Sequence, residues 1–577
     1  MILRIWNKYK TILSKRQIRQ IYILFFLMVI GGFMEMLSVS LIFPFMEAVM
    51  APEETMEKGY VKAFCEFAGI SSSYGFLTFL AVVLAIIYVL KNLYLIFQKS
   101  LQYRFVYRNM FRVQCRLLRS YLNRPYDYFM QVKSGEVLRI VGDDTRRAFE
   151  MLTSYLMMLT EMVVAVALVV TLFFLSPMVT MGISALFVIV VLIVSRLIRP
   201  HLKRAGVVNQ KSYAQMNQWL MQAIQGIKEV KIMRKSAFFE ESFADSGREW
   251  AEGMRKYYVV NSLPRYGIEA VSMAAFFLVI VFLLQHNVAL ASIMPILAAV
   301  AVVAVRILPA SNRISEGIGN VAYQEPMLDK LIEKLEETEA YSGKEAVGGE
   351  SVFLFEKGID LSHVQYRYPH GDMNVLEDAT MKISKGKAVG IVGSSGAGKT
   401  TAVDILLGLL IPRRGEVLAD RKNIQDNLDG WLSQIGYIPQ TIFLLDGDIR
   451  ANVAFGVKPE EVDDNKVWEV LREAALSDFV KELPRGLDTQ LGERGMRLSG
   501  GQRQRIGIAR ALYTDPDILV FDEATSSLDN ETEKAVMESV DTLHGMKTLI
   551  IVAHRLTTIE NCDEVYRVED GRIVRVR

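Results

Sequence analysis

The first half of the chain contains six long apolar stretches. A helix needs about 20 mostly apolar residues to cross the hydrocarbon core of a bilayer, and each stretch is close to or above that length. They predict six membrane-spanning helices, at residues 21–46, 76–97, 153–175, 178–198, 268–285 and 288–308. Only short polar breaks separate the third stretch from the fourth and the fifth from the sixth, so each of these pairs is predicted to be a tight hairpin with an external loop.

The distribution of basic residues predicts the orientation of these helices. Lys and Arg are retained on the cytoplasmic side of a membrane. The segment 98–150 carries eleven of them, whereas Glu53, Glu54, Glu57 and Glu66 outnumber the Lys residues of the first external loop. Both chain ends are therefore expected in the cytoplasm. The inner segments 98–150 and 199–267 are predicted to be helices that extend the membrane spans into the cytosol.

The first apolar stretch follows a basic segment, as the core of a signal peptide does. The run 21–46 is too long for a cleaved signal, however, and no small-residue cleavage site ends it. We therefore interpret it as the first span of a multi-pass membrane protein.

The pattern changes after the sixth stretch. Glycines and charges in the segment 341–352 indicate a domain boundary. From residue 353 onward, short β-branched runs alternate with helical segments, which is typical of an α/β domain with a largely parallel sheet. The sequence therefore predicts a helical membrane domain at 1–340, a linker at 341–352 and an α/β domain at 353–577.

A glycine-rich segment stands between a predicted strand at 388–392 and a predicted helix at 401–410. It fits the pattern GxxxxGK[ST], in which glycines let backbone N–H groups converge on phosphate oxygens, Lys reaches the outer phosphates and Ser or Thr ligates magnesium. The pattern predicts a nucleotide site formed by Gly393, Ser394, Ser395, Gly396, Ala397, Gly398, Lys399, Thr400 and Thr401.

A second apolar run, 518–521, ends in Asp522 and Glu523. An acidic pair at the end of a buried strand can hold magnesium through its first carboxylate and polarise water through its second. Taken alone, such a pair is more often a solvated strand end. Its position downstream of the phosphate loop in the same domain favours nucleotide hydrolysis.

Composition and charge exclude several other classes of function. The formal net charge is only +2, and nucleic-acid binding requires a large local excess of Lys and Arg, so no nucleic-acid partner is expected. The three cysteines, Cys65, Cys115 and Cys562, lack CxxC spacing, so neither a disulfide framework nor a zinc site is predicted. The mean hydropathy of +0.23 fits one membrane half and one soluble half.

The segment Leu498-Ser-Gly-Gly-Gln502 resembles the signature motif of ATP-binding cassette (ABC) proteins. Further elements similar to those of this family follow the family order, with Tyr368 rather than Tyr366 as the aromatic residue that stacks on adenine. The others are Gln440, Asp529 and His554. On this resemblance the chain is identified as an ABC exporter half-transporter, which implies an all-α six-helix transmembrane domain followed by an α/β P-loop nucleotide-binding domain.

The resemblance also implies roles for these residues, with ATP and Mg²⁺ as the ligands. Glu523, Gln440 and His554 would be catalytic, and Thr400, Gln440 and Asp522 would hold the metal. Asp529 would belong to the nucleotide site. The signature residues would contact the phosphates of an ATP bound to the other chain of a homodimer, which gives two composite sites; they are Ser499, Gly500, Gly501 and Gln502.

Three further segments look like the parts of exporters that join the two domains. The segment 492–495 precedes the signature motif, and the segments 134–139 and 226–231 look like the two cytoplasmic coupling loops. For each of the two loop segments, an ordinary amphipathic helix remains the alternative.

Cations in or near the predicted spans suggest what is carried, because burying a charge in lipid is costly. The candidate substrate residues are Lys91, Arg265, Arg306 and Arg313. Guanidinium groups suit phosphate or pyrophosphate oxygens. For Lys91 and Arg265 the alternative is that they extend to the lipid headgroups, and Glu35 is either a helix-to-helix hydrogen-bonding residue or a partner for one of these cations.

The segments 38–44 and 306–313 look similar to bacterial flippases of lipid-linked oligosaccharides. This resemblance implies a bacterial-type inner or plasma membrane as the location and a lipid-linked anionic substrate with a pyrophosphate headgroup. A general lipid or multidrug exporter is the alternative, and it would have a more apolar cavity. The six predicted spans exclude an ABC protein without transport activity, and the presence of Glu523 and His554 argues against a membrane protein that uses ATP only as a gate.

Overall fold

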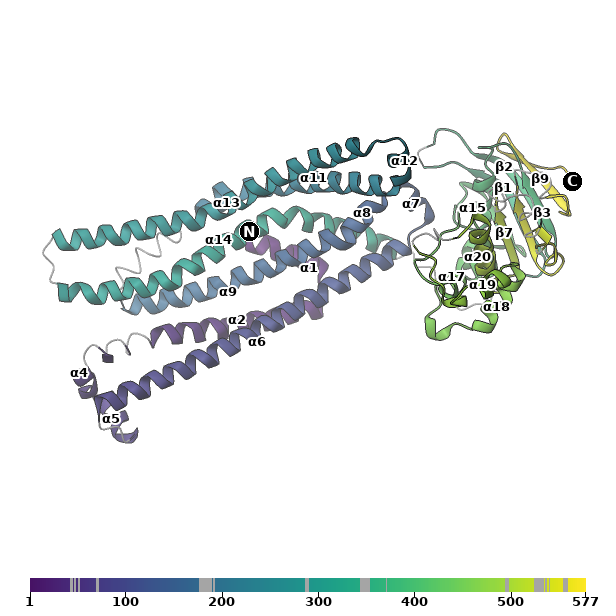
Figure 1. Ribbon diagram of the computed structural model, residues 1–577. Helices are drawn as coiled ribbons and strands as arrows, with labels where there is room; N and C mark the ends of the chain where they lie inside the picture. Colours follow the sequence, from purple (N-terminus) through teal and green to yellow (C-terminus); the bar gives the residue numbers. More distant parts are fainter. Residues whose placement is uncertain are drawn as a thin grey trace. The chain divides into compact units, whose positions relative to one another are not determined.

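Figure 1 shows a computed structural model of the chain. It describes residues 1–577 except 42–44, 46–47, 50–51, 69–71, 176–188, 190–191, 286–289, 343–352, 370, 493–497, 524–533, 535–536, 539 and 554–558. The chain forms two compact units. The first comprises Met1–Leu122 and Lys133–Gly343, and the second comprises Asn123–Val132 and Lys344–Arg577.

The first unit is entirely helical among its described residues. Its α-helices are α1 (Ile2–Ile12), α2 (Lys15–Ser40), α4 (Pro52–Glu57), α5 (Gly59–Ala68), α6 (Ser73–Leu122), α8 (Ser134–Arg139), α9 (Thr145–Leu175), α11 (Arg199–Gln225), α12 (Ile227–Ile232), α13 (Ser236–Gln285) and α14 (Leu290–Ser342). Two π-helical segments join them, at Ile140–Asp144 and Val194–Ile198.

Three helices of the described residues are long and apolar enough to cross a membrane. They lie at Lys15–Ser38, Ser73–Leu122 and Gly135–Ala167, which overlap the first three predicted spans. The predicted hairpin turn after residue 175 lies outside the described residues, as does that at 286–289. The helix α6 continues for 25 residues beyond the second predicted span, which ends at residue 97, so this inner segment is helical as predicted.

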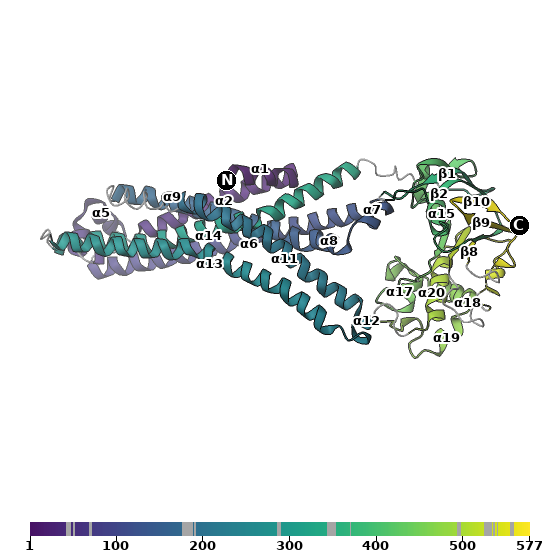
Figure 2. The same ribbon diagram turned by 90° about the horizontal axis from the view of Figure 1, so that it is seen from above.

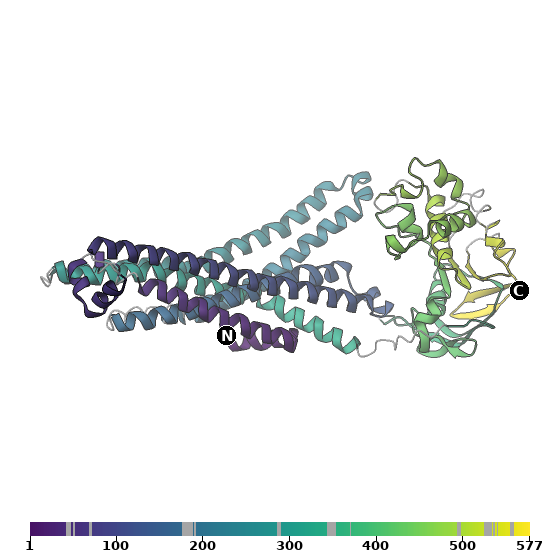
Figure 3. The ribbon, with the colours of Figure 1, turned by 90° about the horizontal axis from the view of Figure 1, so that it is seen from below.

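The core of the first unit forms where α9 and α14 pack together, with α1 and α2 against them. Leu152, Leu156 and Met158 of α9 are almost completely buried there, as are Ile314 and Val321 of α14. Helices α11 and α13 run side by side as a separate pair that ends at α12 (Figure 3).

The second unit contains two β-sheets. A six-stranded sheet has the order β10-β9-β3-β8-β7-β6, with every pairing parallel except that of β9 with β10. Its strands are β3 (Ala388–Val392), β6 (Ile435–Ile438), β7 (Ile518–Asp522), β8 (Thr548–Val552), β9 (Glu564–Glu569) and β10 (Arg572–Arg575). This sheet confirms the predicted α/β architecture.

The other sheet is antiparallel, and the sequence did not predict it. It has the order β2-β1-β4-β5, with β1 (Gly358–Tyr366), β2 (Leu376–Ser384), β4 (Arg414–Ala419) and β5 (Lys422–Asn423). From Ala379 onward, buried and exposed residues alternate along β2, because only one face of this strand packs on the core. Trp431 fills the space beneath this sheet with only 1% of its surface exposed.

Helices cover the parallel sheet and form a lobe of their own, seen beside the strands in Figure 2. The helices of the second unit are α7 (Tyr126–Gln131), α15 (Lys399–Leu406), α16 (Leu428–Leu432), α17 (Ile449–Val453), α18 (Asp464–Glu473), α19 (Ser477–Glu482) and α20 (Gly500–Tyr513). Short 3-10 helices lie at Ile424–Asn427, Pro459–Glu461 and Gly486–Asp488. The buried faces of α18 and α20 share one apolar core with strands β6 and β7.

Candidate nucleotide site and membrane pocket

The glycine-rich loop joins β3 to α15, as the sequence predicts. Gly398 caps α15 with a φ of 102°, a left-handed conformation that glycine adopts without steric cost. At Gly393, an added Cβ would lie 2.5 Å from the carbonyl oxygen of Val568, so no side chain fits there. At Gly396 an added Cβ would meet nothing within 4 Å. The loop is therefore tightly held at its ends and open above its centre, which fits a phosphate chain bound by backbone N–H groups.

Lys399 is held inside this loop. Only 4% of the residue is exposed, and its ammonium donates hydrogen bonds of 3.1 Å to the backbone carbonyls of Gly393 and Ser394. The carboxylate of Glu523 lies 3.9 Å from the same ammonium. A buried ammonium needs such oxygen partners. Phosphate oxygens are the same kind of acceptor, so the cradle suits a nucleotide.

The acidic pair stands at the end of β7. Asp522 is 5% exposed, whereas Glu523 is half-buried and accepts a hydrogen bond of 2.8 Å from the side-chain amide of Gln440. The structure thus brings together the phosphate-loop Lys399, Gln440 and Glu523, which come from three separate segments of the sequence.

The backbone of Glu523 has a φ of 50°. A left-handed conformation costs a non-glycine residue about 1–2 kcal/mol, and its N–H is fixed there by a 3.1 Å hydrogen bond to the carbonyl of Val552. Strained residues of this kind concentrate at functional sites. The strain turns the chain sharply at the strand end, so that Asp522 remains in the sheet while Glu523 meets Gln440.

Two residues near Asp522 were not found by sequence reasoning. The hydroxyl of Tyr437 on β6 donates a 3.2 Å hydrogen bond to Asp522. Asp404, one turn beyond Lys399 on α15, has its pKa raised to about 6 by burial and by the charge of Asp522. Burial also raises the pKa of Asp522. Two carboxyl groups close enough for their charges to interact indicate a site that gains from added positive charge.

The signature segment forms the start of α20. The hydroxyl of Ser499 accepts a hydrogen bond of 3.2 Å from the N–H of Gln502, and the Gln502 side chain accepts one of 2.9 Å from the N–H of Ser499. This reciprocal capping box fixes the first turn of the helix. Among the described residues, no hydrogen bond or ion pair joins residues 498–502 to the phosphate loop of the same chain.

The two tyrosines near the end of β1 differ in accessibility. Tyr366 is 2% exposed and donates a 3.5 Å hydrogen bond to Asp127. Tyr368 is half-buried, and its hydroxyl lies 2.9 Å from that of Thr401. Of the two rings, therefore, that of Tyr368 is the more available for stacking on a base.

Several predicted residues lie outside the described residues. These are Asp529, His554 and most of the segment 492–495, of which only Gly492 is described.

No group of three or more His, Cys, Asp and Glu side chains that could hold a metal ion exists among the residues that the structure describes. The predicted magnesium ligands are instead one hydroxyl, one amide and one carboxylate. Thr400 is exposed at the loop, Gln440 is exposed beside Glu523, and Asp522 lies at the end of β7. Oxygen donors of this type suit Mg²⁺, which keeps several waters and uses few protein ligands.

The predicted coupling loops are placed differently from one another. Residues 227–232 form the short helix α12, and the predicted coupling role of the segment 226–231 stays a prediction. Residues 134–139 form α8 of the first unit, but it is residues 123–132, with α7, that group with the second unit. The segment that packs on the nucleotide-binding domain thus begins eleven residues earlier than the loop we singled out. The sequence analysis missed Tyr126 and Asp127 of this segment. The hydrogen bond from Tyr366 to Asp127 joins residues that are far apart in the sequence, so no local pattern indicates it.

In the helical unit, Lys91 is 3% exposed and its ammonium lies 3.7 Å from the carboxylate of Glu35. This pair favours Glu35 as a cation partner and a structural role for Lys91. Arg313 lies 2.6 Å from Glu161. The backbone of Arg306 belongs to α14, but its side chain lies outside what the structure describes.

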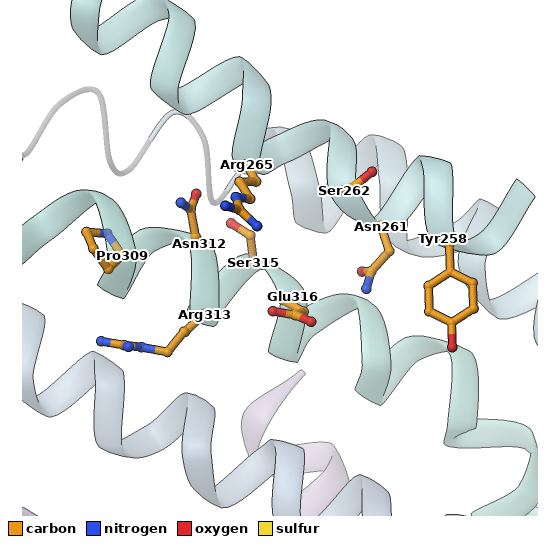
Figure 4. A pocket seen from close by; sticks show the side chains of 9 residues that line it. All are labelled: Tyr258, Asn261, Ser262, Arg265, Pro309, Asn312, Arg313, Ser315 and Glu316. Carbon is orange, nitrogen blue, oxygen red and sulfur yellow. The ribbon is translucent and has the colours of Figure 1, made fainter. Parts of the chain in front are cut away.

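A pocket of about 350 Å³ lies between α13 and α14 (Figure 4). It brings together two of the predicted substrate residues, Arg265 and Arg313. In Figure 4 the guanidinium of Arg265 extends toward Asn312 and Ser315, whereas Arg313 extends to the other side of α14. The complete lining is Tyr258, Asn261, Ser262, Arg265, Pro309, Asn312, Arg313, Ser315 and Glu316.

Comparisons with known proteins agree with this arrangement at the level of the fold. A solved structure described as a bacterial Atm1-family ABC exporter with ATP bound covers 96% of this chain, and 94% of its own chain is covered, with a TM-score of 0.70 and 21% sequence identity. At this identity the likeness shows the fold, a helical transmembrane domain followed by an α/β nucleotide-binding domain.

Relatives with higher identity match part of the chain. Proteins of Staphylococcus aureus strains RF122 / ET3-1 and NCTC 8325 / PS 47, each assigned as a multidrug export ATP-binding/permease protein, are 40% identical over 237 residues. The match covers 41% of this chain and 41% of the length of these relatives.

Two family descriptions match the chain itself. Residues 21–305 match the ABC transporter transmembrane region, and residues 376–526 match the ABC transporter domain that contains the phosphate loop, the acidic pair and the signature segment. Together the two matches span more than half of the chain. The chain therefore belongs to the ABC transporter family, with an ABC transmembrane region followed by an ABC ATPase domain.

Proposed function

We propose that this protein hydrolyses ATP to export an amphiphilic substrate across a membrane, as one half of a homodimer. The observation that carries the ATPase part is the meeting of Lys399, Gln440 and Glu523 at one site. ATP hydrolysis requires a cation for the outer phosphates and a base that orients the attacking water. These three side chains supply both functions.

In this proposal each residue acts from the position described above. Lys399 binds the outer phosphates from inside the loop, and Glu523 accepts a hydrogen bond from the attacking water and receives its proton. Gln440 holds the Glu523 carboxylate at 2.8 Å and so fixes its orientation. Thr400, Gln440 and Asp522 would hold Mg²⁺, which supplies positive charge against the phosphate oxygens when bound.

The homodimer is proposed from the signature segment. Ser499 and Gln502 cap their own helix and form no described bond to their own phosphate loop. The exposed start of α20 therefore remains available to an ATP on a second copy of the chain. With Gly500 and Gly501 it would complete a composite site whose other half is the loop 393–401.

For the substrate we propose a lipid-linked oligosaccharide with a pyrophosphate headgroup. The support is the pocket between α13 and α14. It lies at the inner ends of the fifth and sixth predicted spans. Arg265 is exposed there and forms no ion pair with any described residue. This guanidinium lies 5.8 Å from the ring centroid of Tyr266, and its N–H groups suit paired phosphate oxygens.

Unsatisfied polar atoms point to the same pocket. Ser315 is 2% exposed and its hydroxyl has no hydrogen-bond partner in the described part of the chain, and the same is true of the side-chain oxygen of Asn312. A buried hydroxyl without a partner is costly. In Figure 4 both residues lie beside Arg265, so the wall of the pocket is polar there.

The neighbouring cavity gives space for a large polar group. It measures about 770 Å³, shares Arg313 and Glu316 with the first pocket, and is lined by amide and hydroxyl side chains that include Gln98, Gln102 and Asn320. Such donors and acceptors suit sugar hydroxyls. A multidrug exporter is the second candidate, and the names of the S. aureus relatives favour it.

The two candidate functions can be distinguished by which compounds, lipids or drugs, stimulate ATP hydrolysis by the protein in liposomes. Purified protein would be reconstituted with polyprenyl-pyrophosphate oligosaccharide, with the same lipid lacking its sugars, or with cationic amphiphilic drugs. We expect stimulation by the pyrophosphate lipids and its loss in Arg265→Ala, whereas Arg255→Ala, on the same helix but outside the pocket, retains it. Stimulation by the drugs alone would favour a multidrug exporter.

A further inference from the structure

Four cations, two from α1 and two from α11, surround one buried carboxylate on α14. Glu325 of α14 has no exposed side-chain surface. Its first oxygen lies 2.8 Å from Lys8 and 3.4 Å from Arg4, both on α1, and its second lies 3.3 Å from Arg199 and 3.3 Å from Lys203, both on α11. We call Arg4, Lys8, Arg199 and Lys203 the cation cluster.

The cation cluster carries more positive charge than its acidic partners remove. Besides Glu325, only Asp329 contacts it among the described ion pairs, through a 2.5 Å contact with Lys8. Two carboxylates leave two positive charges in excess. One cation would suffice to neutralise Glu325. Burial raises the pKa of this carboxyl, but Lys8 and Lys203 outweigh that effect and lower it to about 2. The need to neutralise the buried charge of Glu325 therefore does not explain why four cations are present.

Part of this excess charge is open to a ligand. The side chain of Arg4 is 61% exposed and that of Lys203 is 35% exposed, whereas the Nε of Arg199 is buried and has no hydrogen-bond partner in the described structure. An unpaired guanidinium N–H beside two accessible cations requires an acceptor with several oxygens.

The position of the cation cluster indicates where that acceptor comes from. The helix α1 ends at Ile12 and the first candidate span begins at Lys15, so α1 lies next to the membrane, on the side that the basic residues predict to be cytoplasmic. The ring of Trp6 on α1 contacts that of Tyr22 on the first span, with 5.8 Å between centroids. Figure 2 shows α1 beside α14, in agreement with their contacts.

The surface around α1 has the features of an interfacial helix. Leu3 is 77% exposed, and Lys10, Lys15, Arg16 and Arg19 are exposed on the same segment. An exposed apolar side chain among Lys and Arg is typical of helices that rest on anionic lipid. Arg199 begins α11 directly after the fourth predicted span, so both sides of the cation cluster stand at the same boundary.

We propose that the cation cluster binds the phosphate of an anionic phospholipid of the cytoplasmic leaflet. The phosphate oxygens would bridge Arg4, Arg199 and Lys203 and so tie α1 to α11 from outside, as Glu325 ties them from inside. This lipid is not the cargo, because the site lies apart from the residues that line the pocket between α13 and α14. The inference stands independently of the proposed substrate.

The test uses the full-length protein in nanodiscs and the fluorescence of Trp6. We would measure how strongly Trp6 fluorescence is quenched by dibrominated phosphatidylglycerol and, at the same mole fraction, by dibrominated phosphatidylcholine. Quenching by lipid bromine needs close approach, and the other tryptophans, at 219, 250, 431 and 468, lie in segments predicted to be cytosolic. We expect wild-type protein to prefer phosphatidylglycerol about tenfold or more.

The double variant Arg4→Gln/Lys203→Gln should lose this preference almost entirely, because each removed cation lowers it about fivefold. Lys8 and Arg199 still neutralise Glu325, so the variant should fold. If it does not, Arg4→Gln alone should lower the preference about fivefold. Lys15→Gln/Lys211→Gln removes the same two charges from exposed positions on α2 and α11 but leaves the cation cluster and the surroundings of Trp6 intact, so it serves as the control and should retain the preference.

Three results would overturn the proposal. One is equal quenching of the wild-type protein by both lipids. Another is the same loss of preference in Lys15→Gln/Lys211→Gln as in Arg4→Gln/Lys203→Gln, which would assign the effect to general surface charge. The third is displacement of phosphatidylglycerol by millimolar inorganic phosphate, which would assign the site to a soluble anion.

Discussion

The side-chain amide of Gln440 donates a 2.8 Å hydrogen bond to Glu523, although 83 residues separate the two. The other oxygen of Glu523 lies 3.9 Å from the ammonium of Lys399. A single carboxylate thus joins the phosphate loop, the end of β7 and the segment after β6. In our account this carboxylate orients the attacking water, which makes it the first residue to test.

Replacing Glu523 with Gln should abolish ATP turnover and leave ATP binding intact. The amide keeps the size of the side chain but does not accept a proton, and the loss of a general base costs about 10²–10⁴-fold in rate. ATP hydrolysis and equilibrium ATP affinity would be measured on the same preparation. Glu482→Gln, an exposed residue of α19, is the control. Turnover near the wild-type rate would remove Glu523 from its proposed role.

Replacing Lys399 with Ala should instead weaken nucleotide binding itself. Hydrogen bonds to charged groups contribute about 1.5–3 kcal/mol, so we expect ATP affinity to fall at least about tenfold. Titration with a fluorescent ATP analogue would measure this, with Lys481→Ala as the control for loss of a Lys charge. Unchanged affinity would contradict the assignment of the loop 393–400 to phosphate binding.

The proposed composite site predicts complementation between two inactive chains. In a heterodimer of Lys399→Ala and Ser499→Ala, one of the two sites contains neither substitution. Differently tagged chains would be purified as verified heterodimers, and we expect about half of the wild-type ATPase activity if the two sites act independently. Because Ser499 also caps α20, thermal unfolding of the Ser499→Ala chain would be compared first. An inactive heterodimer of folded chains would argue against shared sites.

Asp563 predicts a pH dependence of stability in the ATPase domain. This carboxylate accepts hydrogen bonds from the N–H of Ala388 at the start of β3 and from Lys387, both at 2.9 Å, and contacts His544. Burial opposes its charge, but these donors hold its pKa at about 2, below the usual 3.8. A depressed pKa stabilises the folded state above the unfolded value, and this stabilisation is lost as the pH falls from about 4 to about 2.

Asp563→Asn should therefore lower the free energy of unfolding by about 2 kcal/mol at pH 7. The difference from the wild-type protein should shrink between pH 4 and pH 2. Denaturant unfolding of the full chain, followed by the fluorescence of the buried Trp431, would report it. Asp478→Asn, with a side chain that is 92% exposed, is the control. A difference that does not change with pH would show that the charge of Asp563 is not responsible.

The sequence predicted local features of the ATPase domain well. The strand, loop and helix around Lys399 follow from residues that are adjacent in the chain, because an apolar run, three glycines and a helical run can form only a few local structures. The capping box of Ser499 and Gln502 was not predicted, although its spacing of three residues could have indicated it.

Contacts between distant segments could not be predicted. The bond from Tyr437 to Asp522 spans 85 residues, and the contact of Lys8 with Glu325 spans 317. Periodicity shows which face of an element is apolar, but it does not show which other element that face meets. The antiparallel sheet was missed for the same reason, since β1 pairs with β4 across the whole phosphate loop.

ATP-driven translocation of a polyprenyl-pyrophosphate oligosaccharide in proteoliposomes tests the central claim most directly. We would compare wild-type protein with Glu523→Gln, Arg265→Ala and the control Arg255→Ala, and would measure basal ATP hydrolysis in parallel. The account predicts translocation by the wild type and by Arg255→Ala, none by Glu523→Gln, and a large loss in Arg265→Ala with basal hydrolysis retained. Translocation by Glu523→Gln at the wild-type rate would contradict ATP-driven export, and wild-type translocation by Arg265→Ala would contradict the assignment of the pyrophosphate to this pocket.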